Sequence, residues 1–426
     1  MGNKIIKTSQ HSIKFANSGK IEMLYQFIDD YNEMVWWFVN YFWTTPVKWG
    51  DSVMDIQRNK LSVPNFISTV GVNYPELGLS ARAVKIASGQ AIGIIKSATE
   101  KRRKQLYILS KKMSEGEVES VKKLQSKIDS NPLIKPSKTK LQKQLVLNSI
   151  CCEFISKKTK EFDGWLRISS IGKKYGHIHI PVKMTKHSNR LAGSGYQKNT
   201  SWQISTKTIN SIWEKEKPPK STGSRVLGAD QGKTTCLSLS DGQITPKCLH
   251  GHDLASIIKK MSGKEKASKG FKRTQAHRTN YINWSIKQLD ISDVKELRLE
   301  KLNQMRKGSN SGRELSHWTY TEINAKVYDR CSELGVPVIE QSATYRSQRC
   351  SDCGWTQKSN RKGKEFICRR CGVIHDADIN GALNHEADLY RLPYGFWQMH
   401  ENRAGFYWKS SGLFNVSGEE IAVPHV

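Results

Sequence analysis

Four of the nine cysteines stand in two close pairs, and their spacing is the clearest chemical signal in the sequence. They are Cys350, Cys353, Cys368 and Cys371, with fourteen residues (354–367) between the pairs. Gly354 and Gly372 each follow the second cysteine of a pair, and glycine permits the positive φ that a tight metal-binding turn needs. Two such turns supply four thiolates to one tetrahedral Zn²⁺ with no open coordination position, so we predict a structural zinc ribbon. The other five cysteines are scattered and indicate ordinary thiols.

Three acidic residues form a second candidate site. Asp230 and Glu300 each end a short apolar run, so both are expected at strand ends, where a metal ion can approach a carboxylate. Asp378 follows the last paired cysteine, at the start of a predicted helix. Each alone would be an ordinary surface acid, but converging carboxylates are what two Mg²⁺ ions need to flank a phosphodiester. Asp376 competes with Asp378 for this role, although an acid at a helix start also stabilises the helix itself.

The composition indicates which partner such a site would act on. The 426 residues include 68 Lys and Arg against 39 Asp and Glu, which gives a net charge of +29 and a pI of about 9.7. A surplus of this size repels itself unless a polyanion offsets it, so nucleic acid is the expected partner. The longest apolar run, Met34–Trp43, is too short to cross a bilayer, and no signal-peptide pattern opens the sequence. We therefore expect an intracellular nucleic-acid protein without a membrane partner.

The hydrophobic pattern predicts the elements that must position these residues. In the first half, strands are expected at 4–15, 164–171, 176–182 and 201–206, and helices from about residue 20 to 42 and over 81–112. Polar, proline-containing stretches at 132–143 and 216–223 mark boundaries. Beyond them, strands at 226–229, 235–239, 294–299 and 336–340 alternate with helical sequence that includes 319–334, which predicts a mixed α/β sheet. The aromatic, Gly-rich tail from residue 390 fits no predicted element.

Five segments resemble the RuvC-like nuclease half of the TnpB family, which groups transposon-encoded RNA-guided DNA endonucleases with compact type V CRISPR effectors. They are LGADQG (227–232), LRLEKLN (297–303), TYRSQRCSDCGW (344–355), FICRRCG (366–372) and HDADINGALN (375–384). The resemblance implies that Asp230, Glu300 and Asp378 hold the catalytic Mg²⁺ ions, two in number. It also favours Asp378 over Asp376, because Asp378 and Asn380 match the family's Asp-x-Asn motif. The first motif has Gln231 where leucine is commoner in the family, and no catalytic carboxylate is lost.

The resemblance further implies a multidomain α+β architecture. Residues 1–18 and 145–220 would form a β-rich, barrel-like (OB-like) wedge domain, interrupted by a helical recognition domain at 19–144. Residues 221–345 and 376–390 would form a RuvC-like nuclease domain of the ribonuclease H type. The zinc ribbon at 346–375 would be inserted into that domain, and residues 391–426 would form a tail without assignment.

The implied activity is Mg²⁺-dependent cleavage of DNA directed by a guide RNA, in the cytoplasm of a prokaryotic or phage-infected cell, at the nucleoid. Guide RNA and double- and single-stranded target DNA would be the partners, with Zn²⁺ as the structural ion. Candidate nucleic-acid contacts are Lys101, Arg102, Arg103 and Lys104 in the helical segment, and Arg346, Arg349, Arg369 and Arg370 around the ribbon. A solvated helix face also explains the first of these clusters. The sequence is compatible with one copy or a homodimer on the RNA, and with a transposon protein or a CRISPR effector.

Three other functions share part of this pattern. A nuclease-silent RNA-guided repressor would have the basic charge and the ribbon, but usually lacks one or more of the acids. A DDE transposase orders its acids Asp, Asp, Glu, whereas glutamate stands in the middle here. A zinc-ribbon DNA-binding protein, such as a transposition accessory factor, needs no acid triad. The glycines in 228–234 are one residue too close for a phosphate loop, and His177 and His179 fit an exposed strand face.

Overall fold

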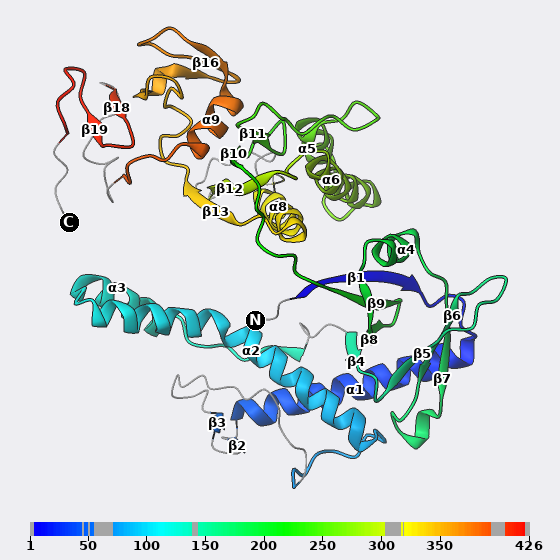
Figure 1. Cartoon of the computed structure of the whole chain (residues 1–426). Coiled ribbons are helices and arrows are strands. Elements are labelled where there is room, and N and C mark those ends of the chain that lie inside the picture. The colour runs from blue at the N-terminus through cyan, green and yellow to red at the C-terminus, as the bar shows by residue number, and fades with distance from the viewer. Residues whose placement is uncertain are drawn as a thin grey trace. The chain divides into compact units, whose positions relative to one another are not determined.

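The computed structural model describes residues 4–44, 47–49, 52–54, 71–138, 144–302, 317, 319–392 and 405–421 (Figure 1). The chain divides into two compact units, Met1–Lys215 and Glu216–Val426. The division falls at the start of the polar stretch 216–223, which the sequence predicts as a boundary. Of the other predicted boundary, 132–143, the last five residues lie outside the described residues. No helix in the described segments is long and apolar enough to span a membrane.

Two larger sheets organise the strands of the N-terminal unit. The first has the order β1-β9-β8-β4, from β1 (Lys4–Ser12), β9 (Thr208–Glu216), β8 (Gln197–Ser205) and β4 (Gln144–Leu147). The second is antiparallel and consists of β5 (Cys152–Ile155), β6 (Gly164–Ile168) and β7 (Ile178–Val182). The short helices η2 (Lys173–Tyr175) and α4 (Lys186–Gly193) flank β7 along the chain. Strands β1, β6, β7 and β8 occupy segments where strands are predicted, whereas β4, β5 and β9 are additional.

Helices α1 (Ser18–Thr44) and α2 (Ala81–Ser114) pack against each other in this unit (Figure 1). The α1 side chains that repeat at three and four residues are buried, which confirms the predicted helix: Leu24, Phe27, Ile28, Tyr31, Val35, Phe38 and Phe42. Helix α2 begins where the Ser80 side chain accepts a hydrogen bond from the Ala83 amide. Helix α3 (Val118–Asp129) follows, and β2 (Val47–Trp49) pairs antiparallel with β3 (Ser52–Met54). One hydrophobic core joins α1 and α2 to the sheets.

A mixed four-stranded sheet with the order β11-β10-β12-β13 organises the C-terminal unit. Its strands are β10 (Arg225–Asp230), β11 (Ser238–Leu239), β12 (Val294–Lys301) and β13 (Val338–Ser342). Strand β10 pairs antiparallel with β11 and parallel with β12, and β12 pairs parallel with β13. Helices α5 (Leu254–Ser262), α6 (Lys269–Lys287) and α8 (Tyr320–Leu334) share its hydrophobic core. The predicted mixed α/β sheet is therefore confirmed.

Two small sheets and one helix complete the unit. Strands β15 (Arg361–Lys362), β16 (Glu365–Ile367) and β17 (Ile374–Asp376) form one sheet, and the short helix η3 (Lys358–Asn360) precedes it. Strand β14 (Trp355–Thr356) pairs with β18 (Phe406–Trp408), which pairs with β19 (Leu413–Phe414). Helix α9 (Ala377–Glu386) follows β17 directly and packs against β10 and β11. The described part of the tail, 405–421, thus shares a sheet with the cysteine-bearing segment.

The close packing of α9 on β10 depends on Gly228. A Cβ atom at this position would lie 1.9 Å from the Ala382 carbonyl oxygen and 2.3 Å from the Glu386 amide nitrogen. Because both are backbone atoms of α9, Gly228→Ala must push the helix away from the strand. We expect this change to lower the free energy of unfolding of the C-terminal unit by about 1–3 kcal/mol, measured by thermal unfolding and by faster amide hydrogen exchange in α9.

The matched control for this prediction is Gly89→Ala in α2. A Cβ there meets no atom within 4 Å, and alanine favours a helix interior over glycine. This control should leave the melting temperature unchanged or raise it. Equal stability of both variants would show that α9 is not held closely against β10.

Candidate functional site

Two of the predicted acids meet at one edge of the mixed sheet. Asp230 is the last residue of β10, and Glu300 lies near the end of the neighbouring parallel strand β12, one residue beyond the Ala229–Leu299 pair. Because parallel strands end at the same edge of a sheet, their side chains converge there. Ligand atoms of Asp230, Glu300 and His385 all lie within 4.8 Å of one another. The structure therefore brings together two of the three predicted acids and adds a histidine.

Burial and mutual repulsion make these carboxyl groups hard to ionise. The pKa of Asp230 is raised well above its usual value, first by burial and then by the charges of Glu300 and Asp378. Burial also raises the pKa of Glu300 to about 7, against the opposing effect of a hydrogen bond from the Gln231 backbone amide. Carboxylates that repel each other in a buried site are stabilised by a bound cation. The electrostatics of the pair thus favour divalent-metal binding.

Asp378 approaches the same site from the first turn of α9. Asp376 is the N-cap of this helix, and its carboxylate accepts hydrogen bonds from the Asp378 and Ile379 amides at 2.9 and 3.2 Å. This contact confirms the interpretation of Asp376 as a helix-start acid. The buried Asp378 carboxylate pairs with Arg361 (Nη2–Oδ1, 3.1 Å) and with Lys364. Two cations from the β15–β16 hairpin therefore neutralise Asp378.

We expect the Lys364 ion pair to compete with metal binding. Lys364→Gln removes a cation that contacts Asp378 and leaves the carboxylate itself in place. Because the lysine is half exposed, the effect should be modest, a tightening of Mn²⁺ or Mg²⁺ affinity by roughly twofold to fivefold in the free protein. Isothermal titration measures it, and Lys362→Gln in the same hairpin is the matched control. Unchanged or weaker metal binding in Lys364→Gln would show that the pair does not oppose metal binding.

His385 is a residue that the sequence reasoning missed. It lies seven residues after Asp378 on α9, so both side chains lie on the face of the helix that packs on β10. Its Nε2 atom is 3.8 Å from Oδ1 of Asp230, and the side chain is 1% exposed. Burial, with a smaller contribution from Arg346, lowers the pKa of His385 to about 3, so the imidazole is neutral at physiological pH. The spacing of seven residues between Asp378 and His385 predicts that both lie on one face of the helix. The sequence alone does not show that this face packs against the sheet that carries Asp230.

Other polar atoms near the acids also fit a bound cation. The Gln231 Oε1 and Thr235 Oγ1 atoms are buried and have no hydrogen-bond partner among the described residues. Gln231 follows Asp230 directly, and its Nε2 donates to the Glu300 carbonyl at 3.3 Å and to Asn324 at 2.6 Å. A Cβ on Gly232 would lie 2.9 Å from Thr235 Oγ1 and 3.3 Å from Asp378 Oδ2, so these two groups are neighbours. Oxygen ligands of this kind suit Mg²⁺.

The four paired cysteines converge as predicted. Their sulfur atoms lie within 4.8 Å of one another, with Sγ–Sγ distances of 3.7 Å for Cys350–Cys371 and 3.6 Å for Cys353–Cys368. Gly354 and Gly372 have φ values of +81° and +79°, which confirms the glycine turns. This arrangement matches a closed tetrahedral zinc site with four thiolates and no vacancy for a substrate.

Two asparagines fasten α9 to the first cysteine turn. The Asn380 side chain donates to the Arg349 carbonyl at 2.8 Å and accepts from the Ser351 amide at 3.0 Å. Asn384 donates to the same carbonyl at 2.7 Å and accepts from the Arg349 guanidinium at 2.6 Å. The asparagine of the Asp-x-Asn motif therefore holds the ribbon against the helix that carries Asp378.

The basic residues predicted as nucleic-acid contacts fall into two groups. Arg102, Arg346 and Arg349 are 5–7% exposed and donate to backbone carbonyls of Asn131, Asn384 and Trp408, so their guanidinium groups support the fold internally. These three arginines were expected to contact nucleic acid at the surface, and the structure shows instead that they are buried. The other candidates are exposed: Lys101, Arg103, Lys104, Arg369 and Arg370. Arg103 and Lys104 also pair with Glu100 within α2.

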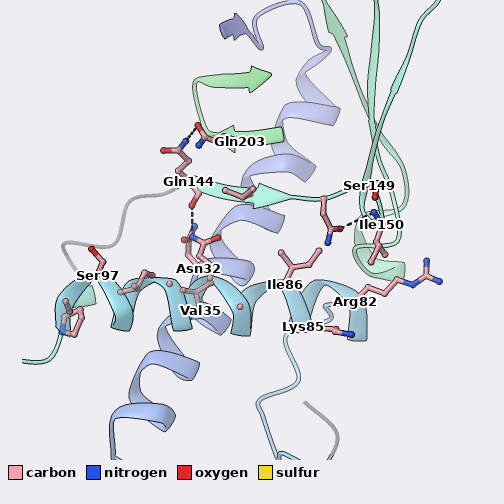
Figure 2. A pocket seen from close by; sticks show the side chains of 18 of the residues that line it. Asn32, Val35, Arg82, Lys85, Ile86, Ser97, Gln144, Ser149, Ile150 and Gln203 are labelled. Atoms are coloured by element: carbon pink, nitrogen blue, oxygen red, sulfur yellow. Dashed lines mark hydrogen bonds between the residues drawn. The ribbon is translucent and has the colours of Figure 1, made fainter. Parts of the chain in front are cut away.

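The N-terminal unit contains a large cavity between α2 and β4 (Figure 2). Its volume is about 1400 Å³, and α1 contributes Asn32 and Val35 to its wall. Gln90 donates to the Gln144 carbonyl, and the Gln144 amide donates to Gln203, both at 3.0 Å. Arg82 and Lys85 of α2 also line the cavity. Amides can bond base edges and cations can bind phosphate, so these groups are chemically suited to nucleic acid.

Comparison with known proteins shows that this chain is similar to RNA-guided nucleases. Residues 320–385, from α8 through α9, match the family model described as Cas12f1-like, TNB domain. The chain is 31% identical over 147 residues to the CRISPR-associated endodeoxyribonuclease Cas12f1 of Sulfoacidibacillus thermotolerans, covering 34% of each protein. It is 24% identical over 215 residues to the putative RNA-guided DNA endonuclease InsQ of Escherichia coli, covering 43% of this chain and 52% of InsQ. These matches confirm the resemblance to the TnpB family and to compact type V effectors.

The matches cover only part of the relatives. The aligned segments span 34% or less of the lengths of three Cas12f1 relatives. A solved structure described as a Cas12f1–sgRNA–target DNA complex superposes on 90% of this chain and 99% of that chain, with 15% identity and a TM-score of 0.42. The family model, at residues 320–385, covers the four paired cysteines and Asp378.

Proposed function

We propose that the chain is an RNA-guided DNA endonuclease that cuts its target with Mg²⁺ at Asp230, Glu300 and Asp378. The observation that carries this proposal is the meeting of Asp230 and Glu300 at one edge of a parallel strand pair, with Asp378 electrostatically coupled to both. The names of the related Cas12f1 and InsQ proteins support RNA guidance and DNA cleavage. The RuvC-like, wedge and recognition domain assignments are part of the same proposal.

The metal ions and the residues of the site would have different roles in cleavage. Two Mg²⁺ ions would supply a metal-activated hydroxide and stabilise the leaving oxygen of an in-line displacement. Asp230, Glu300 and Asp378 would together hold the ions, and the charges of Glu300 and Asp378 both act on Asp230. Arg361 and Lys364 pair with Asp378, and with a metal ion bound to this carboxylate both cations would be available to the phosphate backbone.

The nucleic acid would be held by the exposed basic residues and by base pairing. Lys101, Arg103 and Lys104 on α2, and Arg369 and Arg370 on the ribbon, would contact phosphates. The guide RNA would supply sequence specificity through pairing with the target strand, as in other RNA-guided systems. The net charge of +29 would then offset a guide, a target strand and a displaced strand.

The test is to purify the protein from cells that carry its native locus and to sequence the RNA that accompanies it. We expect one discrete RNA, and we expect the complex to cut DNA that matches its guide segment only when Mg²⁺ is present. Absence of a discrete RNA would overturn RNA guidance. A discrete RNA with metal-independent target binding and no cleavage would instead identify a nuclease-silent binding protein.

A further inference from the structure

His385 is buried beside the acids, and its contacts with the described residues do not include a hydrogen bond to Asp230. The distance of 3.8 Å between its Nε2 and Asp230 Oδ1 exceeds the range of a hydrogen bond. Its other ring nitrogen, Nδ1, has no hydrogen-bond partner within the described part of the chain. Nδ1 is not the nitrogen that faces Asp230, so its lack of a partner does not itself identify a ligand; Nε2 is the ring atom positioned to bind a cation shared with the acids.

The position of His385 on α9 directs it to the acids. Asp378 and His385 lie two helical turns apart on the same face, and Gly381 lies between them. A Cβ on Gly381 would lie 3.0 Å from the Asp230 carboxylate, so glycine lets this carboxylate approach α9 between the two positions. The side-chain amides of Asn380 and Asn384, by contrast, donate hydrogen bonds to the Arg349 carbonyl at the first cysteine turn.

We propose that His385 is a nitrogen ligand of one of the catalytic cations, which it shares with Asp230 and Glu300. The proposal rests on the proposed nuclease function and deepens it. The three side chains offer ligand atoms within 4.8 Å of one another, and the 3.8 Å separation of Nε2 and Oδ1 leaves room for an ion between them. The site would then have two metal positions with different ligands. One would have the carboxylates of Asp230 and Glu300 and the imidazole of His385, and the other would lie at Asp378.

A nitrogen ligand changes which metal the site prefers. Mg²⁺ favours oxygen ligands, whereas imidazole suits transition metals, and Mn²⁺ accepts both. The end of the site at His385 should therefore bind Mn²⁺ more tightly than Mg²⁺, and this preference should depend on His385. An all-oxygen site would show no such dependence.

The test is electron spin echo spectroscopy of Mn²⁺ bound to the full-length, zinc-loaded protein. Wild type should show nitrogen modulation from a directly coordinated imidazole, and ¹⁵N-histidine labelling should alter that modulation. Because labelling uses the unmodified protein, this step does not depend on a variant folding. His385→Gln should abolish the modulation and weaken Mn²⁺ affinity about tenfold or more, with a smaller change in Mg²⁺ affinity.

The matched control is His375→Gln. His375 stands on the neighbouring strand β17, and its Nε2 contacts Asp352 at 2.9 Å, so it has its own partner. This variant should keep the nitrogen signal. Absence of nitrogen modulation in wild type, or its persistence in folded His385→Gln, would overturn the proposal. If the signal is absent while Asp230→Asn still abolishes cleavage, the nuclease function stands and only the histidine ligand fails.

Discussion

Replacement of Asp230 by asparagine is expected to lower the rate of target cleavage by about a thousandfold or more, while guide-RNA binding is unchanged. Asparagine keeps the shape of the side chain but removes the charge that would hold the metal ions. Since the fold already raises the pKa of Asp230, the uncharged amide should not destabilise the metal-free protein. Single-turnover cleavage of guide-matched DNA and a gel-shift assay with the guide RNA measure the two effects.

The adjacent acids of α9 give this prediction a matched control. Asp378→Asn should abolish cleavage as Asp230→Asn does, because it removes another proposed metal ligand. Asp376→Asn should retain cleavage, because asparagine replaces aspartate well as a helix N-cap and the cap bonds to the Asp378 and Ile379 amides can persist. Cleavage by Asp230→Asn at the wild-type rate would contradict the assignment of the active site.

The sequence was sufficient to predict the parts of the site that depend on local patterns. Asp230 and Glu300 end apolar runs, and a strand end is a local feature, so their convergence followed once both strands were expected in one sheet. The cysteine pairs and their glycines are equally local. The choice of Asp378 over Asp376 came from the resemblance, through the Asp-x-Asn motif, and the structure places Asp376 at the N-cap of α9.

The remaining features depend on contacts between segments that are distant in the sequence. His385 becomes significant only when the face of α9 toward β10 is known. Arg346 and Arg349 belong to a basic stretch that resembles a surface, but the backbone carbonyls that accept their hydrogen bonds include those of Asn384 and Trp408. The tail was not predicted as strand because β18 and β19 contain three and two residues, and β18 pairs with β14 about fifty residues earlier.

These long-range contacts make the segment with the four cysteines a structural support for the proposed active site. The Gly354 carbonyl accepts a hydrogen bond from the Trp408 amide at 2.9 Å, and Arg349 binds the Trp408 carbonyl at 2.8 Å. The first cysteine turn therefore connects the tail on one side with α9 on the other, through Asn380 and Ser351. Loss of this turn should disturb the position of Asp378, although Asp378 does not bind zinc.

Cys350→Ser is accordingly expected to reduce bound zinc from one ion per chain to none and to abolish cleavage. Structural zinc contributes about 10–16 kcal/mol of apparent binding free energy in zinc-finger peptides, so three thiolates should not preserve the ribbon. Zinc content by mass spectrometry and hydrogen exchange measure the change, with exchange rising in the ribbon, in 405–421 and in the first turn of α9. Helices α5 and α6 should keep their protection, because they pack in the separate core of the mixed sheet.

Cys248→Ser is the matched control, since Cys248 is a free cysteine outside the cluster. This variant should retain one zinc ion and full cleavage. Removal of zinc from wild type with a strong chelator, followed by excess Mg²⁺, should reproduce the Cys350→Ser result, because Mg²⁺ does not replace zinc among thiolates. Full cleavage by zinc-free protein would show that α9 holds Asp378 in place without the ribbon.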